Sequence, residues 1–131
     1  MSIVSIGYFS FENGHSQAPL LYCISQIIHG GEDLEYYLRG VIGKDPMEPV
    51  GGDPGWQLYS DLQKNGTELY YAWVDEEMTG IEPNEGWYDE KTVKFYIREG
   101  LENVLKEQPN RKIEIEKIFN SVIKILYNEK N

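Results

Sequence analysis

The chain has 131 residues, enough for one domain with its own core, and we expect residues 1–131 to form a single domain. Its hydrophobic share of 40%, with 10 Tyr, 3 Trp and 4 Phe, is typical of a folded rather than a disordered chain. The formal net charge of −10 disfavours direct binding to nucleic acid or to an anionic membrane, because both would repel it.

The cysteine content and the N-terminus bear on the compartment. Cys23 is the only cysteine, so no disulfide can form within the chain and a reducing compartment is expected. The first 14 residues lack the basic start and continuous apolar core of a signal peptide, and no run approaches the roughly 20 apolar residues that span a bilayer. These features predict a cytoplasmic protein.

Two elements are predicted in the first 30 residues. Residues 3–11 are rich in β-branched and aromatic residues and lead into the turn signal Glu12-Asn13-Gly14, which predicts a strand. From Ser16, a suitable helix cap, apolar residues recur at helical spacing until Gly30-Gly31, so a helix is expected there. Its predicted inward face consists of Leu20, Leu21, Ile24, Ile27 and Ile28.

The next segment predicts a short helix and then an irregular connection. The helix begins after Asp33 as a cap and continues to about Val41, with Leu34, Tyr37, Leu38 and Val41 facing inward. Residues 43–55 hold three prolines and four glycines, which predicts a long irregular loop.

Residues 54–66 carry signals for two different structures. Asn65-Gly66 is a strong hairpin turn, which would pair a strand at 57–63 with one at 67–74. A complete short-helix pattern competes with it. That pattern consists of a cap, a first-turn proline, two leucines four residues apart and a closing glycine: Asp53, Pro54, Leu58, Leu62 and Gly66. We predict the helix and retain the hairpin as the alternative.

The remaining elements complete an α+β pattern. The Tyr, Trp and Val content of 67–75 predicts a strand, and two turn signals in 76–88 leave room for one more. Asp89 caps an amphipathic helix that ends at Gln108-Pro109, and a second runs from about 112 to 127. We predict a small, mostly antiparallel sheet covered on one side by four to five helices.

The residues do not form a recognisable reaction centre. His15 lies in a turn, His29 at a helix end and Cys23 on a predicted core face, so none makes a nucleophile and base pair. Zinc and calcium spacings are also absent, and we therefore expect no catalytic residue, cofactor or metal. The alternative is a carboxylate-dependent hydrolase acting on a polysaccharide, with Asp75 paired to Glu82 or Glu85.

The stretch from Leu69 to Glu90 combines acids with large rings. No Lys or Arg occurs between Lys64 and Lys91, so the acids have no local counter-charge. Aromatic anchors beside carboxylates suit contact with a basic protein. We predict a partner-binding surface made of Tyr71, Trp73, Asp75, Glu76, Glu77, Glu82, Glu85, Trp87 and Tyr88. The opposing interpretation is that Trp73 faces the core and only the acids are exposed.

Four stretches together resemble a known family. They are Tyr8-Phe9-Ser10-Phe11-Glu12-Asn13-Gly14, Pro19-Leu20-Leu21, Gly52-Asp53-Pro54-Gly55-Trp56-Gln57-Leu58 and Tyr71-Ala72-Trp73-Val74-Asp75. The pattern is similar to that of small bacterial immunity proteins of contact-dependent growth inhibition systems. The likeness covers roughly Ile3 to Ile97 and consists of turns and packing residues, not of a catalytic signature.

The resemblance implies a non-enzymatic protein that binds the C-terminal toxin domain of its cognate effector in the cytoplasm. Such toxins are commonly nucleases, whose basic groove an acidic inhibitor can occupy. The implied state is a monomer alone and a heterodimer with the toxin. Strand addition is one possible binding mode if the strand at 67–74 lies at a sheet edge.

Overall fold

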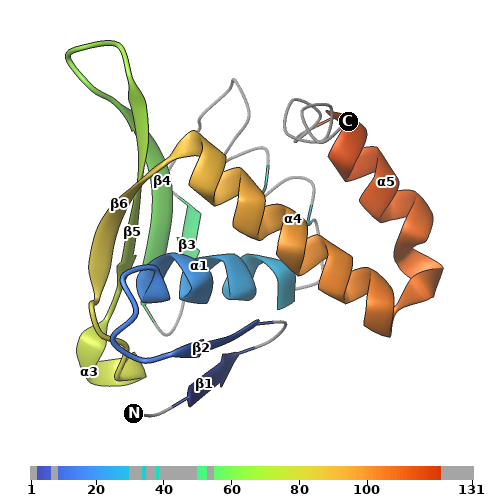
Figure 1. The fold of residues 1–131 in the computed structure, drawn as a ribbon, viewed down its shortest axis with the longest axis horizontal. Coiled ribbons are helices and arrows are strands. Elements are labelled where there is room, and N and C mark those ends of the chain that lie inside the picture. Colours follow the sequence, from blue (N-terminus) through green and yellow to red (C-terminus); the bar gives the residue numbers. More distant parts are fainter. Residues whose placement is uncertain are drawn as a thin grey trace.

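The computed structural model describes residues 3–6, 9–29, 34, 38, 50–52 and 55–121 (Figure 1). It confirms the predicted α+β class: a four-stranded antiparallel sheet carries helices on one face, and a separate two-stranded sheet lies beside it. Within the described part of the chain, no helix has both the length and the apolar character needed to cross a membrane.

The N-terminal strand prediction was wrong in its extent. Residues 3–11 do not form one strand, because β1 (Ile3–Ile6) and β2 (Phe9–Glu12) pair antiparallel as a hairpin. The alternation of β2 places Phe9 and Phe11 in the core while its polar residues face outward. The period of two was therefore read correctly, but the reversal of the chain within the segment was missed.

The first predicted helix is confirmed as α1 (Ala18–His29), and its whole predicted inward face is buried. Ser16 lies too early to cap it, since the backbone N–H of Leu21 donates to the carbonyl of Gln17 at 3.0 Å and makes Gln17 the residue before the helix. Of the predicted helix at 33–41, only Leu34 and Leu38 are described, and both are helical and buried.

The loop predicted at 43–55 contains a short strand, β3 (Val50–Gly52), which forms one edge of the main sheet. It pairs with Trp56, Gln57 and Leu58 of the next strand. Residues 43–49, 53 and 54 lie outside the described residues. A three-residue strand with two glycines has little periodicity of its own, so its pairing partner decides its conformation.

The helix predicted at 54–66 was wrong, and the hairpin alternative is confirmed. Strands β4 (Trp56–Leu62) and β5 (Glu68–Val74) pair in register from Trp56 opposite Val74 to Leu62 opposite Glu68. Gly66 takes a φ of 87°, which favours glycine, and the amide of Gln63 donates to Thr67 O at 2.7 Å. Pairing along the whole segment outweighs the local helix signals.

The second half of the chain follows the predicted order. The short helix α3 (Glu76–Thr79) precedes β6 (Glu85–Asp89), which pairs with β5 and ends the sheet opposite β3. The helix α4 (Glu90–Glu107) is capped by Asp89, whose carboxylate accepts a hydrogen bond from the Thr92 amide at 2.8 Å, as predicted. A 3-10 turn at Pro109–Arg111 leads into α5 (Lys112–Ser121); residues 122–127 of its predicted span lie outside the described residues.

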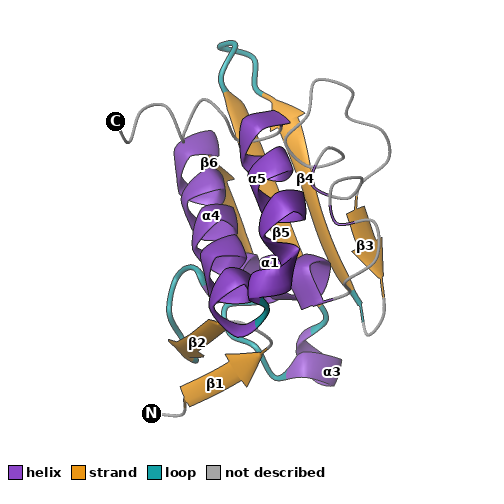
Figure 2. Ribbon diagram, turned by 90° about the vertical axis from the view of Figure 1, so that its right-hand side faces the viewer, coloured by secondary structure: helices purple, strands orange, loops and turns teal. Residues whose placement is uncertain are grey.

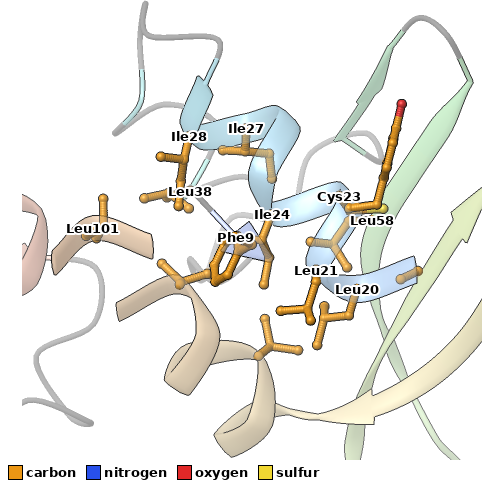
Figure 3. Close-up of a cluster of buried hydrophobic side chains, with 14 of the residues drawn as sticks. Phe9, Leu20, Leu21, Cys23, Ile24, Ile27, Ile28, Leu38, Leu58 and Leu101 are labelled. Carbon is orange, nitrogen blue, oxygen red and sulfur yellow. The ribbon is translucent and has the colours of Figure 1, made fainter. Parts of the chain in front are cut away.

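The hydrophobic core lies between the sheet and the helices (Figure 2). Helices α1 and α4 cover the inward side of β4, β5 and β6, while Phe9 fills the space between the two helices (Figure 3). Gly100 allows their close approach, because a Cβ there would lie 2.3 Å from Ile28 Cδ1 and 3.1 Å from Phe9 Cζ. The described helices α1, α4 and α5 lie on this one side, and no described helix covers the opposite side of the sheet.

Candidate functional site

The uncovered side of the sheet is built from alternate residues of three neighbouring strands. Because successive strand side chains point to opposite faces, the neighbours of buried Leu58, Tyr70, Ala72, Val74 and Tyr88 face outward. The register arranges them in three rows. We call the nine residues the outer face: Gln57, Trp73 and Glu85, then Tyr59, Tyr71 and Trp87, then Asp61, Leu69 and Asp89.

Three aromatic rings occupy the middle row of the outer face. The ring centroids of Tyr59 and Tyr71 are 5.4 Å apart, and those of Tyr71 and Trp87 are 5.0 Å apart, both in tilted arrangements. Trp87 is 50% exposed, an unusual degree for the largest side chain. Trp73 follows in the next row and is half-buried on this face rather than in the core. The opposing interpretation of Trp73 as a core residue was therefore wrong.

The charge of the outer face is negative. It holds the carboxylates of Asp61, Glu85 and Asp89 and contains neither Lys nor Arg. The hydroxyl of Tyr71 donates a hydrogen bond to Oε2 of Glu85, which fixes that carboxylate beside the rings. Partial burial, together with this hydrogen bond and the negative charge of Glu85, raises the pKa of Tyr71 to about 12. Tyr71 therefore stays a neutral donor throughout the physiological range.

A second group of predicted acids lies where β5 ends. The carboxylate of Asp75 caps α3 and accepts hydrogen bonds from the amides of Glu77, at 3.0 Å, and Met78, at 3.4 Å. Glu76 and Glu77 follow in the first turn of α3 and are exposed. Asp75 therefore has a structural task, while Glu76 and Glu77 are free to act on a partner through their charge.

The two remaining predicted residues lie apart from the outer face. Glu82 is exposed, but its backbone is tied to the β2 turn, where its amide donates to Asn13 Oδ1 at 2.9 Å and its carbonyl accepts from the Gly14 amide at 2.7 Å. Tyr88 is buried at 8% exposure on the inner side, and its hydroxyl donates to Ser16 O at 2.7 Å. The structure thus joins Tyr71, Trp73, Glu85 and Trp87 in one surface and turns Tyr88 into the core.

Sequence reasoning missed the β4 side of the outer face. Gln57, Tyr59 and Asp61 were absent from the predicted surface because 54–66 was interpreted as a helix, in which these residues would not share a face with Tyr71. The signal that identifies them is Asn65-Gly66. A hairpin centred there sets Tyr59 directly opposite Tyr71.

Cysteine and histidine are common catalytic residues, but Cys23 and His15 make structural hydrogen bonds in this fold. The Cys23 thiol is buried under the sheet and donates to the carbonyls of Gln57, at 3.3 Å, and Trp73, at 3.6 Å. Burial raises its pKa to about 12, which disfavours the reactive thiolate. His15 Nδ1 accepts the Gln17 amide at 3.1 Å. In the described ranges, no group of three His, Cys, Asp or Glu side chains is arranged to hold a metal ion.

The outer face therefore combines one exposed and three half-buried rings with three carboxylates, on a side of the sheet that no described helix covers. This arrangement suits recognition of a positively charged surface, because it offers both apolar area and opposite charge. No protein-family model matches the sequence, and comparison with curated proteins and with solved structures gave no match.

Proposed function

We propose that this protein is an immunity protein that neutralises a basic toxin domain by binding it stoichiometrically through the outer face. The partner we propose is the C-terminal nuclease domain of a contact-dependent growth inhibition effector, as the sequence resemblance implies. The protein itself makes and breaks no bond in this proposal. It acts in the cytoplasm, as a monomer that becomes a heterodimer with the toxin.

The observation that supports the proposal most directly is the row of Tyr59, Tyr71 and Trp87 on an uncovered sheet. A few buried Trp and Tyr anchors supply most of the energy of typical interfaces, and the polar groups around them exclude water. Trp87 already sits between two carboxylates of its own strand, Glu85 and Asp89. A partner that covers Trp87 therefore also meets both negative charges.

The charge distribution favours a basic partner. The chain has a net charge of −10, and three of its carboxylates lie on the outer face, whose nine residues include neither Lys nor Arg. Opposite charge accelerates encounter and opposes binding of other acidic proteins. A nuclease groove must attract phosphates, so it presents the complementary charge. Protection against a nuclease demands tight binding, about −12 kcal/mol for nanomolar affinity.

The test begins with the neighbouring genes: one that encodes a protein ending in a basic domain supplies the toxin domain for the assays. Co-expression is expected to rescue cells from that domain, and calorimetry is expected to give one-to-one binding. Trp87→Ala should weaken binding by at least about 30-fold, since removal of a central anchor costs about 2 kcal/mol or more. Phe95→Ala is the matched control, because Phe95 is a similarly exposed ring, 46%, on α4 and away from the outer face.

Two results would reject the proposal. If this protein neither rescues cells from a basic toxin domain nor binds that domain, the proposed immunity function is rejected. If Trp87→Ala and Phe95→Ala lower the affinity for the toxin domain equally, the outer face is not the interface. The contribution of charge is measured separately with Glu76→Lys and Glu77→Lys, which spare the cap Asp75. We expect slower association with a smaller salt dependence in the double variant.

The hydrolase alternative gains no specific support. Its proposed acid, Asp75, already accepts two backbone hydrogen bonds as the cap of α3. Turnover of a polysaccharide that is abolished by Asp75→Asn would nevertheless establish it in place of the immunity function.

A further inference from the structure

The strand β6 ends the sheet, and the described residues supply it with only one neighbouring strand, β5. The strand prediction at 67–74 left open that β5 itself lies at an edge, but β5 is central, between β4 and β6. An incoming strand therefore cannot pair with β5. The edge of β6, at the end of the sheet opposite β3, is one place where a strand could be added beside the outer face.

The register identifies which backbone groups face this free edge. The amide of Val74 donates to Asn84 O at 2.8 Å, so these two residues form a hydrogen-bonded pair. Hydrogen-bonded and non-bonded pairs alternate along antiparallel strands. Gly86 and Tyr88 therefore bond to β5, while the N–H and C=O groups of Glu85 and Trp87 point away from it.

The same two residues project their side chains onto the outer face. A strand added to β6 would consequently bond to the backbone of Trp87 and place its own side chain beside the Trp87 ring. The residues two positions away on the added strand would stand opposite Glu85 and Asp89. The carboxylate of Asp89 also caps α4, so Glu85 carries the less compensated charge.

Charge decides which strand can pair here. Antiparallel pairing of two copies centred on Trp87 would set Glu85 of each copy opposite Asp89 of the other on the same face. Like charges directly opposite destabilise a strand pair, so the edge is protected against self-association. A strand with basic residues at those two positions would instead form two oppositely charged pairs.

We infer that the edge of β6 accepts an extended segment of the partner in which one apolar residue lies opposite Trp87 and basic residues lie two positions to either side. The added strand extends the sheet and covers the outer-face rings. In the cell this mode rests on the proposed function, because the basic segment belongs to the toxin domain. The chemistry of recognition, however, is a property of β6 alone.

The first experiment uses a disulfide-closed hairpin peptide whose free strand reads Arg-Thr-Val-Thr-Arg. Amide hydrogen exchange, followed by NMR with saturating peptide, is expected to slow at Glu85 and Trp87. The amides of Gly86 and Tyr88 serve as internal controls, because they already bond to β5. A hairpin with Glu in place of both Arg residues should leave the exchange at all four positions unchanged.

The second experiment needs no ligand. Glu85→Lys turns both acid–acid pairs of the self-paired edge into oppositely charged pairs, so this variant is expected to dimerise in sedimentation and to protect the Trp87 amide. Glu77→Lys makes the same change of charge in α3, away from the edge, and should sediment like the wild type. Circular dichroism checks that both variants keep the fold.

The inference is overturned if the basic hairpin leaves exchange at Glu85 and Trp87 unchanged, or if Glu85→Lys sediments like Glu77→Lys. A toxin domain that binds through Trp87 while the edge amides stay unprotected would retain the proposed function and reject only strand addition. Slowed exchange with the basic hairpin, in the absence of any toxin binding, would retain the edge and reject the function.

Discussion

The two faces of the sheet are made by the same strands and by similar residues, yet they meet different environments. Tyr70 and Tyr71 are adjacent in β5, but Tyr70 is 1% exposed beneath the helices while Tyr71 lies in the open outer face. In β6 the same alternation buries Tyr88 and exposes Trp87. The inner rings stabilise the fold through burial, whereas the outer rings remain available to a partner.

This difference teaches that aromatic content alone does not mark a binding surface. Tyr88 satisfies its hydroxyl with the carbonyl of Ser16 and is committed to the fold. Tyr71 uses its hydroxyl to position the carboxylate of Glu85, on a face that no described helix covers. The side of the sheet, and not the residue type, separates structural from functional candidates.

The largest expected effect comes from truncating neighbouring residues of β4 on opposite faces. Leu58→Ala should lower the free energy of unfolding by about 2–5 kcal/mol, because Leu58 is fully buried and a cavity would remain. Tyr59→Ala should cost about 1 kcal/mol or less, since it removes one cross-strand ring contact. Urea unfolding measures both variants. Equal costs would mean that the outer face is also part of the core.

A smaller effect is expected from Gly86→Ala in β6. A Cβ at Gly86 would lie 2.5 Å from Tyr88 Oη and 2.8 Å from its Cζ, so the buried ring must shift and strain its hydrogen bond to Ser16. We expect destabilisation of about 1–3 kcal/mol in thermal or urea unfolding. Unstrained replacement of glycine by alanine instead stabilises by about 0.4–1 kcal/mol. A stabilised variant would therefore contradict this packing.

The smallest expected effect concerns the alkaline titration of tyrosines on the two faces. The pKa of Tyr71 is raised from 10.0 to about 12 by partial burial and by Glu85, and that of Tyr88 is raised to about 12 mainly by burial. Because these folded-state pKa values exceed the unfolded one, their stabilising contributions are complete below pH 10 and are lost as the pH rises through 12.

Substitution of the carboxylate separates these two tyrosines. Glu85→Gln should lower the pKa of Tyr71, because it removes the negative charge and the charged acceptor, and should leave that of Tyr88 unchanged. Tyrosinate absorbance, with Tyr71→Phe and Tyr88→Phe to assign the two steps, provides the measurement. A shift of both tyrosines, or of neither, would show that Glu85 does not act specifically on Tyr71.

Sequence patterns predicted the elements whose signals are local. The helix α1, with Leu20, Ile24 and Ile28 on one face, and the helix α4, capped by Asp89, follow from spacing and capping alone. The segment 54–66 failed because its helix and hairpin signals were both locally complete. The energy of pairing with β5 decided between them, and that energy depends on residues outside the segment.

The sequence by itself determined the class of fold, the strand β5, the two long helices and a concentration of acids and rings between residues 69 and 90. Tertiary structure alone decided that Tyr59 and Trp87 join Tyr71 and Trp73 on one face, and that Tyr88 does not. The physical reason is the period of two in a strand: adjacent rings are indistinguishable in the sequence until the helices cover one side of the sheet.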